Sequence, residues 1–256
     1  MTITERHEHI LKKINTSGKV EVPELSEQLN VSEVTIRKDL RILEDKGLLF
    51  RTHGGATKTN PYTSDKPVQV KQFVHTDEKN SIAKEACKLI GDTDSIILAS
   101  GTSILAMARS LNPPHHLNVI TSAINVSMEL ARHEQIEVMQ LGGQLRHSST
   151  SVVGPYAESF LDNITCGMYF LGVDGIDLDF GLTTTNLSEA SLNQKCIDVA
   201  QVTVVLADSS KFGKRGFGRI CNLDQVQHII TDSGIAPEIV QELENRGVKV
   251  SIVEVG

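Results

Sequence analysis

Residues 20–56, VEVPELSEQLNVSEVTIRKDLRILEDKGLLFRTHGGA, contain two short helical patterns followed by a pair of glycines. Pro23 suits the first turn of a helix over 22–29, where a backbone N–H has no partner, and Asn30 suits its left-handed end. Ser32 then stands at an N-cap position. Apolar residues at helical spacing follow on one face: Ile36, Leu40 and Leu43. The stretch therefore predicts a helix-turn-helix with a small β wing.

The second helix of this unit carries the residues that DNA binding requires. In a helix-turn-helix, the N-terminal residues of the second helix reach base edges in the major groove. Ser32 and Thr35 stand at that end, where hydroxyls and free N–H groups can hold a phosphate. Arg37 is the candidate for a bidentate contact with guanine. The other candidate DNA contacts, mainly to phosphates, are Lys38, Arg41, Arg51, His53 and Gly54. The alternative is an ordinary solvated helix face.

Composition places the chain among ordinary globular proteins. Its 256 residues are 39% hydrophobic and 22% charged, which favours two domains over one. We expect no transmembrane helix, because no run of about 18 apolar residues occurs, and the N-terminus MTITERHEHI lacks the apolar core of a secretion signal. The four cysteines are scattered without a CxxC pair, so neither a zinc site nor a disulfide framework is indicated. We expect a cytoplasmic protein with reduced thiols and no metal or cofactor.

The net charge of −7 is distributed unevenly. Residues 1–58 contain ten Lys or Arg and nine Asp or Glu, whereas residues 59–256 contain fifteen and twenty-three. Local clustering on the second helix and wing can still attract DNA, although the charge of the whole region is only +1. We therefore expect one DNA-binding head to bind weakly and a homodimer or homotetramer to be the functional species.

The remaining chain separates into three predicted regions. Thr2 and Glu5 form a capping box for a first helix, with Ile3 and Ile10 among the residues expected to face the core. The first helix, the helix-turn-helix and the wing make up a DNA-binding domain over 1–57. Residues 58–76 are polar, contain two prolines and show no apolar period, which predicts a linker; a surface loop of either domain is the alternative. Residues 77–256 form the second predicted domain.

Short apolar runs alternate with helical patterns throughout the second domain. The strand-like runs are 95–99, 117–121, 137–141, 168–173, 202–207, 227–231 and 248–253. The helical patterns include 77–90, 104–111, 125–132, 189–200 and 237–246. This alternation predicts an α/β domain with a mostly parallel sheet covered on both faces. In such sheets, ligands bind beyond the carboxyl ends of the strands.

Five polar clusters are predicted at such strand ends. The turn Ser100-Gly101-Thr102-Ser103 opens a helix and offers hydroxyls, a close backbone approach and a helix N-terminus, all of which suit a phosphate. The other clusters contribute Gly143, Arg146, Asp174, Asn186, Glu189 and Lys211. Each cluster alone is also explained by an ordinary turn. Together they can converge on one pocket, because the carboxyl ends of parallel strands share one edge.

Two sets of motifs resemble one family. The pattern V-S-x-x-T-I-R-K-D-L-x-x-L-E-x-x-G over 31–47, followed by R-T-H-G-G-A over 51–56, resembles the N-terminal signature of the DeoR family of bacterial sugar-responsive repressors. The later series SGTS, GGxLR, GVDGI, GLTTTNxxEA and ADSSKFG resembles the effector domain of that family, which is similar to ribose-5-phosphate isomerase. The resemblance implies a repressor that binds operator DNA and releases it when a phosphorylated sugar binds.

The chain departs from the family pattern at several positions. It has Lys38 where Arg is usual, Ala99 where Asp is usual, Ser122 where Asn is usual and Asn193 where Lys is usual. The Asn193 variant together with LGVDGIDLDFG resembles the AgaR-type branch, which is linked to amino-sugar use. We expect the changes at the pocket rim to alter which sugar is recognised. They also leave open a DNA-binding protein whose pocket no longer responds to a ligand.

An isomerase-like enzyme is the competing class. Sugar-phosphate isomerisation needs a positioned base, for which Glu189 or Asp174 could serve. The isomerase has a further aspartate three residues before its matching Asp, and this chain has Leu171 there. The missing acid and the N-terminal DNA-binding unit favour binding without turnover.

Overall fold

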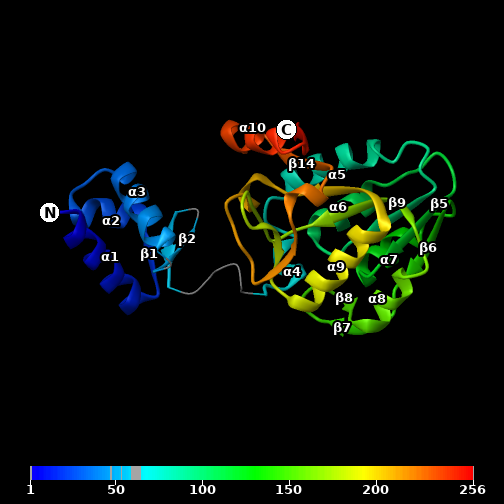
Figure 1. Cartoon of the computed structure of the whole chain (residues 1–256), viewed down its shortest axis with the longest axis horizontal. Coiled ribbons are helices and arrows are strands. Elements are labelled where there is room, and N and C mark those ends of the chain that lie inside the picture. The colour runs from blue at the N-terminus through cyan, green and yellow to red at the C-terminus, as the bar shows by residue number, and fades with distance from the viewer. Residues whose placement is uncertain (1, 47, 53, 59–64, 256) are drawn as a thin grey trace. The chain divides into compact units, whose positions relative to one another are not determined.

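The chain folds into two compact units, Met1–Ser64 and Asp65–Gly256 (Figure 1). The computed structural model describes residues 2–46, 48–52, 54–58 and 65–255. None of the helices in these ranges is long and apolar enough to cross a membrane.

The N-terminal unit contains three helices and a small sheet among its described residues. In chain order these elements are α1 (Ile3–Ser17), β1 (Lys19–Glu21), α2 (Val22–Leu29), α3 (Glu33–Asp45), β2 (Phe50–Thr52) and β3 (Gly55–Thr57). The capping box at Thr2 and Glu5 is confirmed, as is the left-handed conformation of Asn30 at the end of α2. Ser32 is the N-cap of α3, as predicted.

The three strands pair antiparallel in the order β1-β3-β2, which confirms the predicted wing. Gly55 is required where β3 pairs with β1, because a Cβ there would lie 1.8 Å from the carbonyl oxygen of Val20. Behind the sheet, one apolar core joins all three helices: Ile10, Ile14, Val20, Val22, Leu25, Leu29, Ile36, Leu40, Leu43, Leu49 and Ala56. The prediction that Ile3 faces this core is wrong, since it lies in the first turn of α1 and is 49% exposed.

The C-terminal unit is organised around a parallel sheet. Within the described residues the sheet has seven strands in the order β15-β14-β12-β9-β4-β5-β6, and every adjacent pair is parallel. The bounds are β4 (Ser95–Leu98), β5 (Leu117–Thr121), β6 (Ile136–Gln140), β9 (Cys166–Gly172), β12 (Ala200–Leu206), β14 (His228–Asp232) and β15 (Lys249–Val253). All seven apolar runs of the sequence are therefore confirmed as strands, and so is the α/β fold class.

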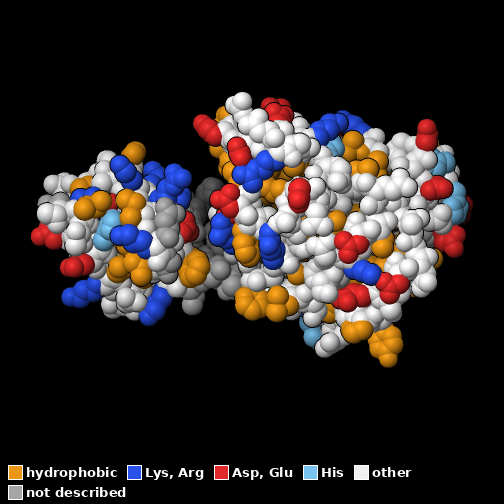
Figure 2. Space-filling model, viewed as in Figure 1, with side chains coloured by type: hydrophobic (Ala, Val, Ile, Leu, Met, Phe, Trp, Pro, Cys, Tyr) orange, Lys and Arg blue, Asp and Glu red, His pale blue; other side chains and the backbone are white. Residues whose placement is uncertain are grey.

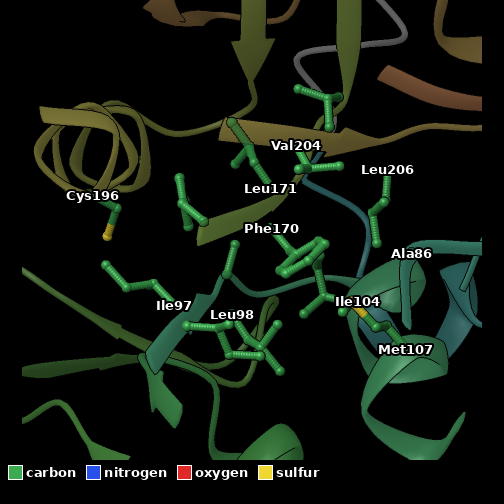
Figure 3. Packing of buried hydrophobic residues seen from close by; sticks show 14 of the residues in the cluster. Ala86, Ile97, Leu98, Ile104, Met107, Phe170, Leu171, Cys196, Val204 and Leu206 are labelled. Atoms are coloured by element: carbon green, nitrogen blue, oxygen red, sulfur yellow. The ribbon is translucent and has the colours of Figure 1, made fainter. Parts of the chain in front are cut away.

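Helices cover this sheet on both faces. The helices of this unit within the described residues are α4 (Val68–Lys71), α5 (Thr76–Lys88), α6 (Thr102–Ser110), α7 (Ile124–Leu130), α8 (Pro155–Leu161), α9 (Leu187–Val199) and α10 (Pro237–Asn245). The consecutive residues Tyr169, Phe170 and Leu171 of β9 are all fully buried, which requires cover on both sides of the strand. Phe170 lies beside Ile104 and Met107 of the α6 side (Figure 3).

Several short elements were not predicted. A second sheet, β10-β11-β13, is antiparallel and consists of β10 (Gly175–Asp177), β11 (Gly181–Thr184) and β13 (Gly218–Cys221). A hairpin pairs β7 (Gln144–Arg146) with β8 (Ser151–Val153). Two short 3-10 helices also occur among the described residues of this unit, η1 (Ser209–Lys211) and η2 (Leu223–Gln225).

The predicted linker over 58–76 differs from the structure in its second half. Residues 65–76 belong to the C-terminal unit, and they contain α4. Val68 is buried, and its backbone N–H donates to the carbonyl oxygen of Ser148 at 2.6 Å. Polar composition did not reveal this docking, because the segment buries a single valine and its other contacts are polar. Residues 59–64 of the predicted linker lie outside the described residues.

Candidate functional site

Helix α3 presents two faces of opposite character. Its apolar face is buried through Ile36, Leu40 and Leu43. Its outward face carries the exposed side chains of Val34, Arg37, Lys38 and Arg41, at helical spacing. Val34 is 73% exposed although it is a large apolar residue, and the sequence analysis did not select it. Its place outside the apolar period of α3 was the available signal. Among the described side chains of the N-terminal unit, Figure 2 shows Lys and Arg interspersed with hydrophobic groups on the visible face.

The first turn of α3 holds the predicted hydroxyls. The backbone N–H of Thr35 donates to the hydroxyl of Ser32 at 3.2 Å, and the two hydroxyl oxygens are 3.0 Å apart. Arg37 donates to Glu33 one turn earlier, with a distance of 2.7 Å from Nη2 to Oε2. Both side chains of this ion pair are about half exposed. Solvent screening keeps such a pair weak, so Arg37 can exchange Glu33 for an anionic or base partner at small cost.

A buried aspartate that the sequence analysis missed attaches α3 to α1. Asp39 is 1% exposed, and its carboxylate accepts two hydrogen bonds from Arg6, at 2.7 and 3.1 Å. A ring nitrogen of His7 lies 3.2 Å from the same carboxylate. The bidentate Arg6 pair fixes the direction of α3 relative to α1, since it has one favourable geometry. Asp39 was not identified because it lies among charged residues, which usually form a solvated helix face.

The structure describes two of the three wing residues that were predicted to contact DNA. Arg51 is partly exposed, and its backbone N–H donates to Glu44 of α3 at 2.8 Å while its guanidinium lies 3.6 Å from the same carboxylate. Gly54 is exposed. His53 lies outside the described residues.

Three neighbouring strands of the parallel sheet end in the predicted polar residues. Strands β4, β9 and β12 are adjacent and parallel, so their carboxyl ends share one edge. At that edge β4 leads into the Ser100–Ser103 turn, β9 into Asp174 and β12 into Asp208 and Lys211. Gly101 is the N-cap of α6 and has no side chain to take up the first N–H groups of the helix, while Ser103 is buried.

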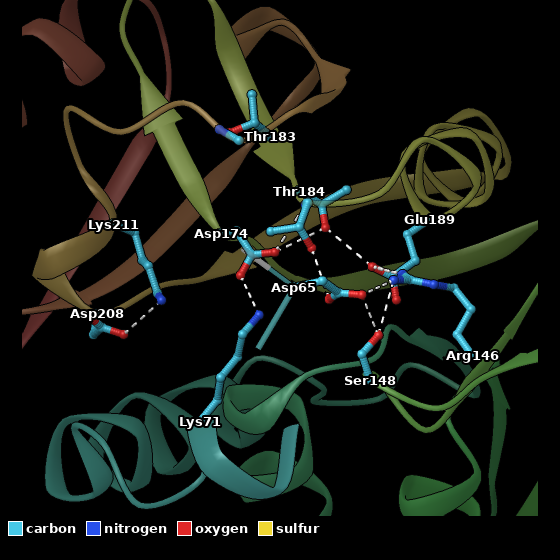
Figure 4. A network of polar contacts seen from close by, with 12 residues as sticks. Asp65, Lys71, Arg146, Ser148, Asp174, Thr183, Thr184, Glu189, Asp208 and Lys211 are labelled. Atoms are coloured by element: carbon cyan, nitrogen blue, oxygen red, sulfur yellow. Dashed lines mark hydrogen bonds and ion pairs between the residues drawn. The ribbon is translucent and has the colours of Figure 1, made fainter. Parts of the chain in front are cut away.

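Asp174 is held by three donors from two segments of the chain. Its carboxylate accepts from Lys71 Nζ at 2.8 Å, from the hydroxyl of Thr184 at 3.1 Å and from the backbone N–H of Thr185 at 3.3 Å (Figure 4). Burial opposes ionisation of this carboxyl group, but the Lys71 ammonium and the Thr184 hydroxyl outweigh it and lower its pKa. Asp174 is therefore an ionised acceptor at neutral pH.

Arg146 and Glu189 form the second half of the same network. Nη1 of Arg146 lies 2.7 Å from Oε2 of Glu189, and both side chains are nearly covered. Within the described residues no acceptor lies in line with an N–H of that Nη1, so the contact is electrostatic. Glu189 also accepts from Thr184 at 3.3 Å and from Ser151 at 3.5 Å, while its backbone N–H donates to Asn186, the N-cap of α9.

The network includes two residues from the predicted linker. Asp65 accepts from Arg146, Ser148 and Thr185, and Lys71 is the cation that faces Asp174. We call the whole set the strand-end cluster: Asp65, Lys71, Arg146, Ser148, Ser151, Asp174, Thr184, Thr185 and Glu189. Sequence spacing offered no signal for Asp65 or Lys71, because their partners lie 80 to 120 residues further along the chain.

Lysines gather beside the strand-end cluster. Lys211 Nζ is 4.0 Å from the buried carboxylate of Asp208. Lys79 of α5 is only 5% exposed, and its ammonium donates to the carbonyl oxygens of Lys71, at 2.8 Å, and Val74. Burial lowers the pKa of Lys79 to about 8. A positive charge held in this way favours an anion nearby.

Other residues singled out by the sequence have structural roles. Gly143 has φ of +147°, and a Cβ there would lie 2.6 Å from the carbonyl oxygen of Val153 in the β7–β8 hairpin. Asn193, expected at the pocket rim, instead accepts a hydrogen bond from the buried Tyr169 at 2.9 Å, since it lies one helical turn beyond Glu189 on α9. Ala99 and Ser122 are both buried at strand ends. Among the described residues no group of three or more His, Cys, Asp or Glu could hold a metal ion.

Two family models match the chain. One is described as the DeoR C terminal sensor domain and matches residues 74–233. The other is described as a DeoR-like helix-turn-helix domain and matches residues 6–61. The matches fall on the two units described above.

Two relatives that align over nearly the whole chain are named as transcriptional regulators. An uncharacterized HTH-type transcriptional regulator, YulB, from Bacillus subtilis is 37% identical over 253 residues, which cover 99% of this chain and 98% of that protein. A putative aga operon transcriptional repressor from Escherichia coli O157:H7 is 37% identical over 252 residues, which cover 98% and 94%.

Solved structures match at lower similarity. Ribose 5-phosphate isomerase A from Methanocaldococcus jannaschii aligns with a TM-score of 0.39 and 21% identity over 54% of this chain and 55% of that chain. The full-length sorbitol operon regulator SorC from Klebsiella pneumoniae aligns with a TM-score of 0.39 and 11% identity over 99% and 96%.

Proposed function

The chain belongs to the DeoR family of transcriptional regulators, and from this premise we propose that it represses a carbohydrate-use operon and is released from operator DNA by a phosphorylated sugar. Family membership places it among regulators and not among sugar-phosphate isomerases, the enzyme class considered above. An amino sugar is the finer proposal, supported by the resemblance to the putative aga operon repressor.

The observation that carries the ligand proposal is the shared edge of β4, β9 and β12. The Ser100–Ser103 turn at that edge combines hydroxyls with the N-terminus of α6, an arrangement that stabilises a phosphate. The carboxylates of Asp174 and Glu189 are acceptors suited to sugar hydroxyls, while Arg146 and Lys211 supply positive charge. We assign these residues, with Asn186 as the cap that orients Glu189, to effector binding.

The DNA proposal rests on the outward face of α3. We assign Arg37 to base recognition and Lys38, Arg41 and Arg51 to phosphates. Val34 adds an apolar group that suits contact with a thymine methyl group. Because the N-terminal region carries so little net charge, we propose that a homodimer or homotetramer in the cytoplasm presents two heads to paired half-sites.

The proposed switch is a linkage between two equilibria. The effector favours release only by the difference between its affinities for the free and the DNA-bound arrangements. Binding should also stabilise the folded protein, by about 2.7 kcal/mol at 100 times the dissociation constant.

Operator binding tests this proposal. Fluorescence anisotropy with DNA from the upstream region of the gene should show release by one phosphorylated sugar but not by its unphosphorylated form. Thr102→Ala combined with Ser103→Ala should keep DNA affinity and lose the response, whereas Ser110→Ala at the other end of α6 should keep both. A response that survives the double substitution would remove the phosphate role of the turn. A protein that binds its operator but responds to no sugar phosphate would support a ligand-independent regulator instead.

A further inference from the structure

Asp65 occupies a set of donors that suits an oxyanion. Its Oδ2 lies 2.5 Å from Nη2 of Arg146 and 2.6 Å from the hydroxyl of Ser148, and its Oδ1 accepts from the hydroxyl of Thr185 at 3.2 Å (Figure 4). A guanidinium group with two hydroxyls is a donor set that holds carboxylates and phosphates alike. The chain itself therefore supplies the anion at this place.

Asp65 begins a short docked segment. We call residues 65–71 the α4 segment; they follow directly after the N-terminal unit in the chain. Four further contacts hold the segment: the N–H of Val68 on Ser148, the amide of Gln69 on the Thr150 hydroxyl at 3.2 Å, Lys71 on Asp174, and the ammonium of Lys79 on the carbonyl oxygen of Lys71. Asp65 is the first of these anchors in the chain and is 38% exposed in its side chain, so water reaches it.

The charges around Arg146 limit what can bind beside it. The guanidinium already lies between two carboxylates, Asp65 at 2.5 Å and Glu189 at 2.7 Å, and is 13% exposed. A third anion added to this arrangement would meet two negative charges for one positive charge, which is unfavourable in a poorly solvated place. Exchange of Asp65 for the incoming anion avoids that cost. Glu189 is more deeply covered and is held by Thr184 and Ser151 as well.

We propose that Arg146, Ser148 and Thr185 form an oxyanion subsite, separate from the Ser100–Ser103 turn, in which Asp65 is the resident ligand and an anionic group of the effector is its competitor. Occupation of the subsite detaches Asp65 and loosens the α4 segment, where the sensor unit joins the DNA-binding unit. The effector part of this inference rests on the proposed function. The anion competition does not.

The test measures binding of inorganic phosphate to the full chain by calorimetry at constant ionic strength. Asp65→Ala should bind phosphate about 3- to 10-fold more tightly than the wild type, because the internal competitor is gone. Asp65→Asn should show a smaller gain, since the amide still accepts hydrogen bonds. Asp162→Ala removes another partly exposed, ion-paired aspartate of the same unit and should show no such gain.

Two further variants locate the gain. Ser148→Ala with Thr185→Val in the Asp65→Ala background should lose it, whereas Thr102→Ala with Ser103→Ala in that background should retain it. Hydrogen exchange supplies a readout that needs no ligand. The amides of Val68 and Gln72 should exchange faster in Asp65→Ala, and in the wild type they should exchange faster when phosphate is added.

The outcomes separate this inference from the proposed function. Equal phosphate affinity in wild type and Asp65→Ala overturns the subsite even if sugar phosphates release operator DNA. A gain that disappears with Thr102 and Ser103 also overturns it, because the phosphate then lies at the α6 turn. A gain that depends on Ser148 and Thr185 supports it even if no sugar phosphate releases the DNA, in which case the proposed function fails alone.

Discussion

The outward face of α3 and the strand-end cluster hold charged groups in opposite ways. Arg37 is about half exposed and pairs with Glu33 on its own helix. Arg146 is nearly covered and pairs with Asp65 and Glu189 from distant segments. A surface built on one helix can lose a side chain without loss of the fold, whereas a network that joins separate segments also supports the fold. Substitutions in the two regions should therefore separate binding from stability.

The largest expected effect is the loss of stability in Arg146→Ala. Removal of the cation leaves the Glu189 and Asp65 carboxylates without their common partner, which should lower the free energy of unfolding by about 2–4 kcal/mol. Urea denaturation measures it, with the exposed Arg132→Ala as control. Arg146→Met with Glu189→Gln should recover part of the loss. If Arg146→Ala costs no more than Arg132→Ala, the cluster does not support the fold.

Arg37→Ala should have the converse effect to Arg146→Ala: it should weaken DNA binding and leave stability nearly unchanged. The operator affinity should fall by about 1–3 kcal/mol with relaxed preference at one base pair, while the free energy of unfolding stays within about 0.5 kcal/mol of wild type. Binding to a set of single-base operator variants measures the preference, and Lys12→Ala on the exposed side of α1 controls for the lost charge. A uniform loss over all operator variants would make Arg37 a phosphate contact.

A pH-dependent difference should distinguish the buried lysine of the sensor unit from an exposed one. Burial lowers the pKa of Lys79 from 10.5 to about 8 in the folded chain. Between these values the unfolded chain binds the proton more strongly, so the contribution of Lys79 to the free energy of unfolding rises with pH, by about 1–2 kcal/mol.

Denaturation at pH 7.5 and 10 measures this contribution. The stability of the wild type relative to Lys79→Met should rise by this amount between the two pH values, whereas its stability relative to Lys88→Met, changed at an exposed position of α5, should not depend on pH. The opposite contribution of buried thiols with a raised pKa, such as Cys196, is common to all three proteins and cancels in these differences. A difference between wild type and Lys79→Met that does not change with pH would contradict a depressed pKa for Lys79.

The smallest expected effect is that of a second substitution on α3. Glu33→Gln frees Arg37 from its ion pair and removes a negative charge near the proposed DNA surface, so operator affinity should increase by about 0.3–0.5 kcal/mol. Glu8→Gln, an exposed change on α1, serves as the matched control. Weaker binding by Glu33→Gln would mean that the ion pair orients Arg37 for its contact.

Local pattern predicts those parts of the molecule whose partners are close in the chain. The period of Ile36, Leu40 and Leu43 predicts the buried face of α3, and seven apolar runs predict the parallel sheet. The antiparallel sheet β10-β11-β13 was missed because its strands have only three or four residues. The sequence analysis named three residues of the strand-end cluster, Arg146, Asp174 and Glu189. It did not name Asp65 or Lys71, since only the folded chain places them there.

The position of the α4 segment bears on how such regulators can be recombined. Residues 65–71 follow the DNA-binding unit in sequence but contact the sensor unit throughout. A chimaera joined between residues 64 and 65 keeps Asp65 and Lys71 with their native partners. One joined after residue 76 replaces both with side chains from another protein and leaves Arg146 and Asp174 to accept foreign neighbours. Exchange of DNA-binding heads should therefore succeed most often at the earlier junction. That junction lies before residue 77, where the sequence analysis placed the start of the second domain.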